Sequence, residues 1–292
     1  MKKRLILLFI LALPISAFSK CIPDTLISLG EVDLNFRIIK GSGVNILFES
    51  GGGDDLTVWD KIAPETAKRT GATVICYDRA GFGKSSLTDI PHSIKRESEW
   101  LWECLTRLGL NKNLILAGHS FGGWMIRMTS YLHPDAVKGI LFIDPFSNEI
   151  VEIMGAATID AFQKPGTYKE LGVKNDEEFA ALQSDKEKQS RLTRQQKSSL
   201  RFWGKTGTGE KYIEMKNTII PSGIPVKIIT SGKQWLPDDF MKSWRASHER
   251  LNASIKDSEL IVAKDSDHYV IFREPELVIE QLTRLVNQVT GK

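Results

Sequence analysis

The chain has 292 residues, of which 41% are hydrophobic, so it is long enough for one large globular domain with a full core. Removal of a leader that contains Lys2, Lys3 and Arg4 leaves 36 of the 39 basic residues against 36 acidic ones. This balance gives no support for nucleic-acid binding, which depends on concentrated Lys and Arg.

The first residues have the layout of a secretory signal peptide. A basic start, Lys2 to Arg4, precedes an apolar run from Leu5 to Leu13 and then small residues. A membrane anchor is the alternative, but it needs about 20 apolar residues, roughly twice the length of this run. We therefore predict a signal peptide over residues 1–19, cut after Ser19. The mature chain, residues 20–292, is then exported to the periplasm or the medium without a stable membrane span.

The three cysteines cannot all pair in an oxidising compartment. Cys76 lies in an apolar run and is expected in the core, which leaves Cys21 and Cys104 as a possible pair. No Cys-x-x-Cys or His/Cys spacing suggests a metal site.

After the leader, short apolar runs alternate with longer segments of helical periodicity, which predicts a mostly parallel sheet wrapped by helices. Strands are expected over residues 44–48, 73–77, 114–117, 139–143, 226–230 and 259–263. Helices are expected over residues 59–67, 96–108, 121–132, 239–251 and 275–289.

This alternation is interrupted over about residues 146–217. Charged and Gln-rich stretches dominate there, and apolar residues such as Phe179, Leu192 and Trp203 are spaced among them. A disordered linker is one interpretation. The apolar anchors favour a helical lid inserted after the strand expected over residues 139–143, which counts as the sixth strand of the fold.

The run Gly118-His119-Ser120-Phe121-Gly122 fits the pattern G-x-S-x-G, between an expected strand and an expected helix. A turn this sharp exposes the serine hydroxyl and strains its backbone, and glycines two residues before and after relieve the crowding. The pattern also occurs by chance in structural turns. Its position between a strand and a helix makes Ser120 a candidate nucleophile.

With this elbow, the chain resembles the α/β-hydrolase fold family from about Gly41 to the C-terminus. The run Asp78-Arg79-Ala80-Gly81-Phe82-Gly83-Lys84-Ser85 resembles the family's D-R-x-G-x-G-x-S turn, a scaffold feature. The Gly51-Gly52-Gly53 turn occupies the place of the family's oxyanion loop, where Ser50 replaces the usual histidine. Asp267-His268 lies where the family's catalytic histidine follows the last strand. The resemblance implies an α/β-hydrolase of the lidded esterase or lipase kind.

A serine nucleophile needs a general base, and five histidines are available. His119 is the variable position of the elbow, His92 precedes the nucleophile, and His133 reads as the end of a helix. His248 lies in a charged helical stretch and is expected to be solvated. Only His268 follows a terminal strand in the family's order, so it is the predicted base.

The sequence does not decide which carboxylate orients the predicted base. The family's usual position after the seventh strand has no carboxylate until Asp238 and Asp239. Asp144, at the end of the sixth strand, matches branches that place the acid there, such as haloalkane dehalogenase-like and pancreatic lipase-like enzymes. An aspartate before Pro145 could also be purely structural. Asp144 is the preferred acid, with Asp238 or Asp239 as the alternative.

Two backbone N–H groups are expected to stabilise a tetrahedral oxyanion, those of Phe121 and Gly52. Three consecutive glycines let this loop approach a substrate closely, although a plain flexible turn is the alternative. No cofactor is needed for this chemistry.

The sequence therefore predicts an exported serine hydrolase that acts on a small acyl substrate, with carboxylic ester cleavage through an acyl-enzyme as the broad expectation. Lactone, thioester, amide or carbon–carbon cleavage, or a ligand-binding protein on the same fold, are the alternatives. The serine excludes the family branches with an aspartate nucleophile, such as epoxide hydrolases and dehalogenases.

Overall fold

The computed structural model describes residues 21–204 and 207–291. The predicted signal peptide, residues 1–19, lies outside these residues. Within the part of the chain that is described, no helix combines the length and the apolar character needed to cross a membrane.

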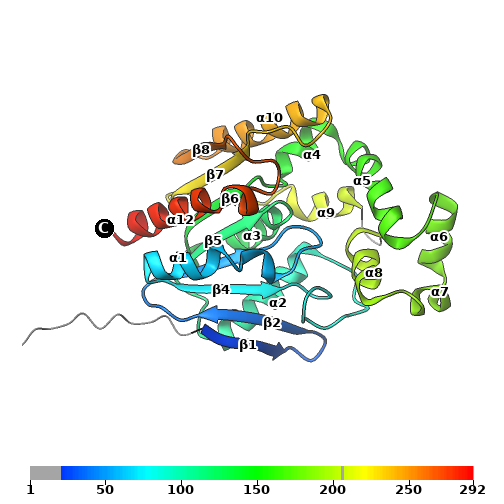
Figure 1. Cartoon of the computed structure of the whole chain (residues 1–292), viewed down its shortest axis with the longest axis horizontal. Coiled ribbons are helices and arrows are strands. Elements are labelled where there is room, and N and C mark those ends of the chain that lie inside the picture. Colours follow the sequence, from blue (N-terminus) through cyan, green and yellow to red (C-terminus); the bar gives the residue numbers. More distant parts are fainter. Residues whose placement is uncertain (1–20, 205–206, 292) are drawn as a thin grey trace, which may run out of the picture.

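An eight-stranded sheet forms the centre of the molecule, in the order β1-β2-β4-β3-β5-β6-β7-β8 (Figure 1). β2 pairs antiparallel with β1 and with β4, and all the other pairs are parallel. The strands are β1 Cys21–Ser28, β2 Asp33–Ile39, β3 Asn45–Glu49, β4 Thr73–Asp78, β5 Leu114–His119, β6 Val137–Ile143, β7 Val226–Ser231 and β8 Ser258–Ala263.

Both faces of the central strands are buried, which explains why they read as continuous apolar runs. Successive side chains point to opposite faces, so in β3 Phe48 belongs to one core layer and Leu47 to the other. The helices that cover one layer are α1 Ile62–Thr70, α11 Val270–Arg273 and α12 Pro275–Thr290. The helices that cover the other are α2 Ile94–Arg107, α3 Gly122–Leu132 and α10 Asp238–Ser254.

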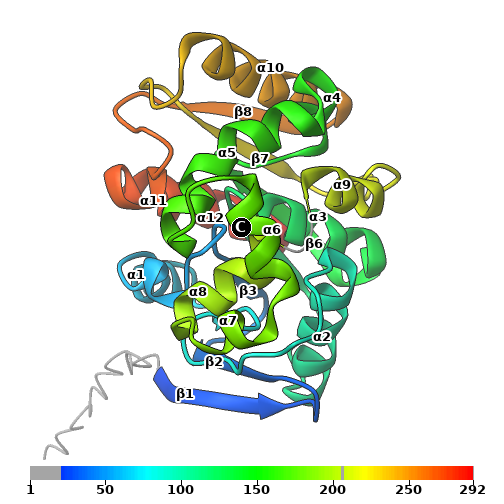
Figure 2. The ribbon, with the colours of Figure 1, turned by 90° about the vertical axis from the view of Figure 1, so that its right-hand side faces the viewer.

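The segment between β6 and β7 is helical, as its apolar anchors predict. Its helices are α4 Asn148–Met154, α5 Ala156–Leu171, α6 Asp176–Ser184, α7 Lys186–Ser190, α8 Arg194–Ser199 and α9 Thr208–Met215, with a π-helical turn over Leu200–Gly204. Figure 1 shows α5 to α8 on the side toward which the β4 arrow points, and in Figure 2, where that side faces the viewer, these helices lie in front of the sheet. They therefore stand beyond the carboxyl ends of the parallel strands.

The predicted class of a mostly parallel, helix-flanked sheet is confirmed, but two strands and the short helix α11 were missed, and the first helix starts later than expected. β1 and β2 are antiparallel strands at the sheet's edge, so they lack the fully apolar signature that identified the others. The helix expected from Trp59 is instead a 3₁₀ turn, Leu56–Trp59, followed by α1 from Ile62. Asp55 caps that turn by accepting a hydrogen bond from the Thr57 N–H.

The possible pairing of Cys21 with Cys104 is not found. Cys104 lies on the buried face of α2, in the core between α2 and the sheet, and its thiol is free. Burial raises the pKa of this thiol to about 12, which makes it unreactive.

Candidate active site

Ser120 stands at the turn between β5 and α3 in a left-handed backbone conformation, with φ 53°. Its N–H donates to the Ile143 carbonyl over 3.1 Å, which fixes the turn against the neighbouring strand. A Cβ at Gly118 would lie 2.5 Å from the Gly122 carbonyl oxygen, and one at Gly122 would lie 2.5 Å from that of Glu49. The elbow therefore requires both glycines.

Asp144 follows β6 as Ser120 follows β5. His119 pairs with Ile143 in the sheet, so the two residues leave adjacent parallel strands at the same level. Asp144 also has a left-handed backbone, with φ 42°, and its N–H donates to the Ile229 carbonyl over 2.7 Å. Two strained non-glycine residues side by side mark this edge as the functional part of the sheet.

His268 lies in the loop after β8, and its imidazole ring bridges the side chains of Ser120 and Asp144. Its Nε2 lies 2.8 Å from the Ser120 Oγ, and its Nδ1 lies 2.7 Å from the Asp144 Oδ2. The other carboxylate oxygen, Oδ1, accepts a hydrogen bond from the Ser231 N–H over 2.7 Å. The structure thus brings the predicted nucleophile, base and preferred acid into one hydrogen-bonded chain.

The environment of Asp144 favours its charged form. Full burial acts to raise its pKa, but the hydrogen bonds from His268 and Ser231 and the nearby imidazoles hold the pKa below its usual value. Because Asp144 accepts at both oxygens, His268 carries its proton on Nδ1. Nε2 is then free to accept the proton of the Ser120 hydroxyl.

The alternative acids lie elsewhere. Asp238 and Asp239 occupy the exposed first turn of α10, where they contact Gln234 and Lys242. Neither contacts His268. At the family's usual acid position, Ser231 instead supplies a backbone N–H to Asp144.

Aromatic residues fix the plane of the His268 ring. Trp235 stacks on it with a centroid distance of 4.2 Å and an interplanar angle of 21°, and Trp244 meets its edge at 5.7 Å. His119 is buried beside it and donates from Nε2 to the His268 carbonyl over 2.9 Å. Burial lowers the pKa of His119 to about 3, so this support stays neutral.

The prediction that His248 is solvated is wrong. Its side chain is fully buried behind Asp144, with Nδ1 2.8 Å from the Thr230 Oγ1 and Nε2 2.9 Å from the Pro145 carbonyl oxygen. The charged residues around it in the sequence face solvent, while the helical period turns His248 toward the sheet. Burial lowers its pKa, so it is a neutral support for the strand end that carries Asp144.

The glycine turn after β3 is held by Arg79, from the turn after β4. This buried guanidinium donates to the Glu49 carboxylate and to the Ser50 carbonyl, each over 2.6 Å, and also to the Gly51 carbonyl. A Cβ at Gly51 would lie 3.5 Å from the Ser120 Cβ. The loop therefore sits directly against Ser120, and Gly52 follows the two tethered carbonyls.

The D-R-x-G-x-G turn is also a scaffold, as the sequence predicts. Asp78 accepts hydrogen bonds from Asn35, from the Leu56 N–H and from the Lys84 N–H, all within 2.9 Å. A Cβ at Gly83 would lie 2.3 Å from this carboxylate. The turn thus fixes the position from which Arg79 reaches the glycine loop.

Comparison with known families agrees with this geometry. The model of the family described as alpha/beta hydrolase fold matches residues 44–275. The chain is an α/β-hydrolase.

Curated relatives of this α/β-hydrolase are distant. Protein YqjL of Bacillus subtilis is 22% identical over 82% of this chain and 82% of its own length. The pimeloyl-[acyl-carrier protein] methyl ester esterase of Pseudoalteromonas atlantica is 32% identical, over 35% of this chain and 38% of its own length.

Solved structures share the fold of the α/β-hydrolase at low sequence identity. The epoxide hydrolase CorEH has a TM-score of 0.65 at 15% identity, covering 91% of this chain and 99% of that one. An esterase from Thermogutta terrifontis has a TM-score of 0.58 at 19% identity, covering 93% and 99%. At these identities the structural similarity establishes the fold only. The reaction depends on the residues of the site.

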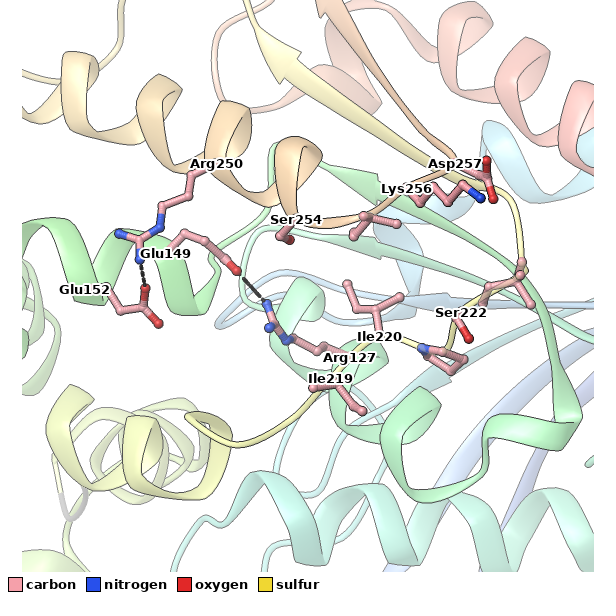
Figure 3. A pocket seen from close by; sticks show the side chains of 14 residues that line it. Arg127, Glu149, Glu152, Ile219, Ile220, Ser222, Arg250, Ser254, Lys256 and Asp257 are labelled. Carbon is pink, nitrogen blue, oxygen red and sulfur yellow. Dashed lines mark hydrogen bonds and ion pairs between the residues drawn. The ribbon is translucent and has the colours of Figure 1, made fainter.

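Two cavities of the hydrolase that are larger than those at Ser120 lie away from this site. One of about 480 Å³ lies among α3, α4 and α10, where Arg127 pairs with Glu149 and Arg250 pairs with Glu152 (Figure 3). Two smaller cavities, of about 170 and 40 Å³, reach Ser120 itself. Among the residues that the structure describes, no group of three or more His, Cys, Asp or Glu side chains could hold a metal ion.

Sequence reasoning did not identify Arg79 as a support of the glycine loop, Trp235 as a partner of His268, or Lys211 beside Ser120. The role of Arg79 could have been predicted from the motif alone, because a charged residue within a buried turn requires a partner. Trp235 and Lys211 carry no motif. Only the packing of the segment between β6 and β7, and of the loop after β7, shows where they lie.

Proposed function

We propose that this protein is an exported serine hydrolase that cleaves carboxylic esters through an acyl-enzyme on Ser120. The observation that carries the proposal is the continuous hydrogen-bonded chain from the Ser120 Oγ through His268 to the buried Asp144. Export rests on the leader of the sequence. The similarity to a methyl ester esterase over part of the chain supports an ester as the substrate.

The reaction has two halves. His268 takes the Ser120 proton as Oγ attacks the carbonyl carbon, and then gives that proton to the leaving alcohol. Water attacks the acyl-enzyme with the same base and releases the acid. Asp144 fixes the tautomer of His268 and stabilises its charged form, while the N–H groups of Phe121 and Gly52 stabilise the oxyanion.

The helices between β6 and β7 serve as a lid in this proposal. Trp203 of the π-helical turn covers the glycine loop, because a Cβ at Gly52 would lie 2.6 Å from the Trp203 Cζ2. Residues of α5 and α9 line the cavities at Ser120. Closing the site in this way excludes bulk water from the acyl transfer.

Epoxide hydrolysis is less well supported, although CorEH shares the fold. The resemblance places an aspartate nucleophile at the elbow of that branch, and here the residue is Ser120. A ligand-binding protein would have no need of a serine, a histidine and a buried carboxylate at hydrogen-bond distance.

A fluorophosphonate probe tests the proposal, because it labels only an activated serine. The mature protein is expected to be labelled at Ser120, as located by mass spectrometry of peptides. Ser120→Ala abolishes the labelling, and His268→Ala reduces it strongly. Ser199→Ala serves as a matched control and leaves it unchanged. An unlabelled, folded wild-type protein would refute the serine-hydrolase function.

Gly52→Ala is expected to lower kcat for ester turnover by about 10²-fold, because the added methyl group displaces the loop from Trp203 and misaligns one oxyanion donor. The measurement is steady-state turnover, with urea unfolding to check stability. Gly166→Ala, where a methyl group meets open space on α5, is the control and leaves kcat unchanged. Full activity of Gly52→Ala would show that this loop does not contribute to the oxyanion site.

A further inference from the structure

The two cavities that meet at Ser120 differ in chemistry. The larger, about 170 Å³, is walled by Trp235, Phe240, Trp244 and other apolar side chains, and it includes His268. The smaller, about 40 Å³, is bordered by Phe121, Trp203 and Lys211 and does not include His268. Ser120, Phe146 and Gln163 line both cavities.

The position of His268 assigns the two halves of an ester to these cavities. The leaving alcohol takes its proton from the His268 Nε2, so it departs on the side where His268 lies. The apolar 170 Å³ cavity therefore takes the alcohol, and the 40 Å³ cavity beside the Phe121 end of the site takes the acyl group.

Lys211 places a positive charge in the acyl cavity. Its side chain, from α9, is only 3% exposed, and Nζ lies 5.6 Å from the ring centroids of both Phe202 and Trp203. An ammonium group has three N–H donors, so it can bind a ligand oxygen in addition to its existing contacts. Burial lowers its pKa to about 8, against the effect of Asp160 and nearby glutamates, so it remains charged at neutral pH.

Three of the four carboxylates whose charge acts on Lys211 have other partners, and the fourth, Glu210, is exposed on α9. Glu97 accepts hydrogen bonds from His92 and Arg201, Glu214 accepts them from Ser93 and the Lys95 N–H, and Asp160 caps α9 through the Thr208 N–H. These contacts tie the carboxylates to the protein around the cavity. A carboxylate brought by a substrate would form a charge-assisted hydrogen bond with Lys211 inside it.

We propose that Lys211 binds a free carboxylate on the acyl group, so that the substrates are half-esters of short dicarboxylic acids with an apolar alcohol. This rests on the proposed ester cleavage at Ser120. The size of the cavity limits the acyl group, because about 40 Å³ holds roughly three water-sized groups. A carboxylate alone occupies most of that space, so at most one or two methylene groups can separate it from the ester carbonyl.

The test compares two benzyl esters of the same shape. Monobenzyl succinate carries the carboxylate, and benzyl isocaproate replaces it with an uncharged branched end. The wild-type enzyme is expected to show a kcat/KM for the half-ester roughly 10- to 100-fold above that for the neutral ester. Lys211→Met removes this preference, so that the ratio of the two kcat/KM values falls to about 1. Lys216→Met, an exposed lysine just after α9, keeps the preference.

The possible failures are distinguishable. An unlabelled Ser120 overturns the hydrolase function itself. A labelled Ser120 in a wild-type enzyme that does not favour the half-ester overturns the role of Lys211, without need of any variant. A preference for the half-ester that persists in Lys211→Met also overturns the role of Lys211. If that variant does not fold, Lys211→Gln takes its place, and the wild-type comparison still decides the outcome.

Discussion

Asp144→Asn is expected to lower kcat for a carboxylic ester by about 10⁴-fold while the fold stays intact. Asp144 accepts one hydrogen bond at each carboxylate oxygen, from the Ser231 N–H and from the His268 Nδ1–H. Asparagine has a single acceptor oxygen. If that oxygen stays with Ser231, the amide N–H₂ faces His268 and moves the imidazole proton to Nε2. The base can then no longer accept the proton of Ser120.

The experiment measures kcat for Asp144→Asn beside Asp238→Asn and Asp239→Asn, with circular dichroism to confirm folding. The α10 variants are expected to retain wild-type turnover, because both side chains are exposed and neither contacts His268. A loss of three or more orders of magnitude in Asp238→Asn, with Asp144→Asn active, would transfer the role of the acid to α10.

Arg79→Met is expected to lower both stability and turnover. The guanidinium is 1% exposed and pairs with a Glu49 carboxylate that is buried to the same degree. Breaking a buried pair by removing one partner costs about 3–5 kcal/mol of unfolding free energy, because the other group is left without compensation. The carbonyls of Ser50 and Gly51 lose their tether as well, so the glycine loop moves and turnover falls by about 10²-fold.

A double variant separates these two effects. Glu49→Gln combined with Arg79→Met removes the buried carboxylate, so it recovers part of the stability lost in Arg79→Met alone. Its turnover stays low, because the loop is still untethered. Urea unfolding and ester turnover provide the two readouts. Arg284→Met, which breaks only an exposed pair with Glu280, shifts stability by less than about 0.5 kcal/mol. Recovery of turnover in the double variant would show that Arg79 does not position the loop.

The position of Ser120 could be predicted because its signal is local, whereas His268 was predicted from the resemblance to the family. A glycine-flanked serine between a strand and a helix has few structural solutions, and the crowding at Gly118 and Gly122 shows why both glycines are needed. The histidine was selected by its place after the last strand. The central strands could be predicted because burial on both faces leaves a continuous apolar run.

The choice among the aspartates could not be made in this way. Asp144 and Asp238 both follow strands at the correct end of the sheet, and which carboxylate reaches His268 depends on the pairing of β5, β6 and β7. His248 was misjudged for a related reason. A helical residue among charged neighbours is buried or exposed according to the direction in which the helix packs, and that direction is a property of the fold.

The sequence by itself determined the α/β-hydrolase fold and the glycine-flanked turn at Ser120, because both depend on backbone geometry and apolar periodicity within short segments. Tertiary structure decided what surrounds Ser120: the approach of Asp144 to His268, the tether from Arg79 to the glycine loop, and the place of Lys211 in the smaller cavity at Ser120. Each of these joins residues at least about 28 positions apart in the chain. Such contacts arise from strand register and helix packing, which no local pattern specifies.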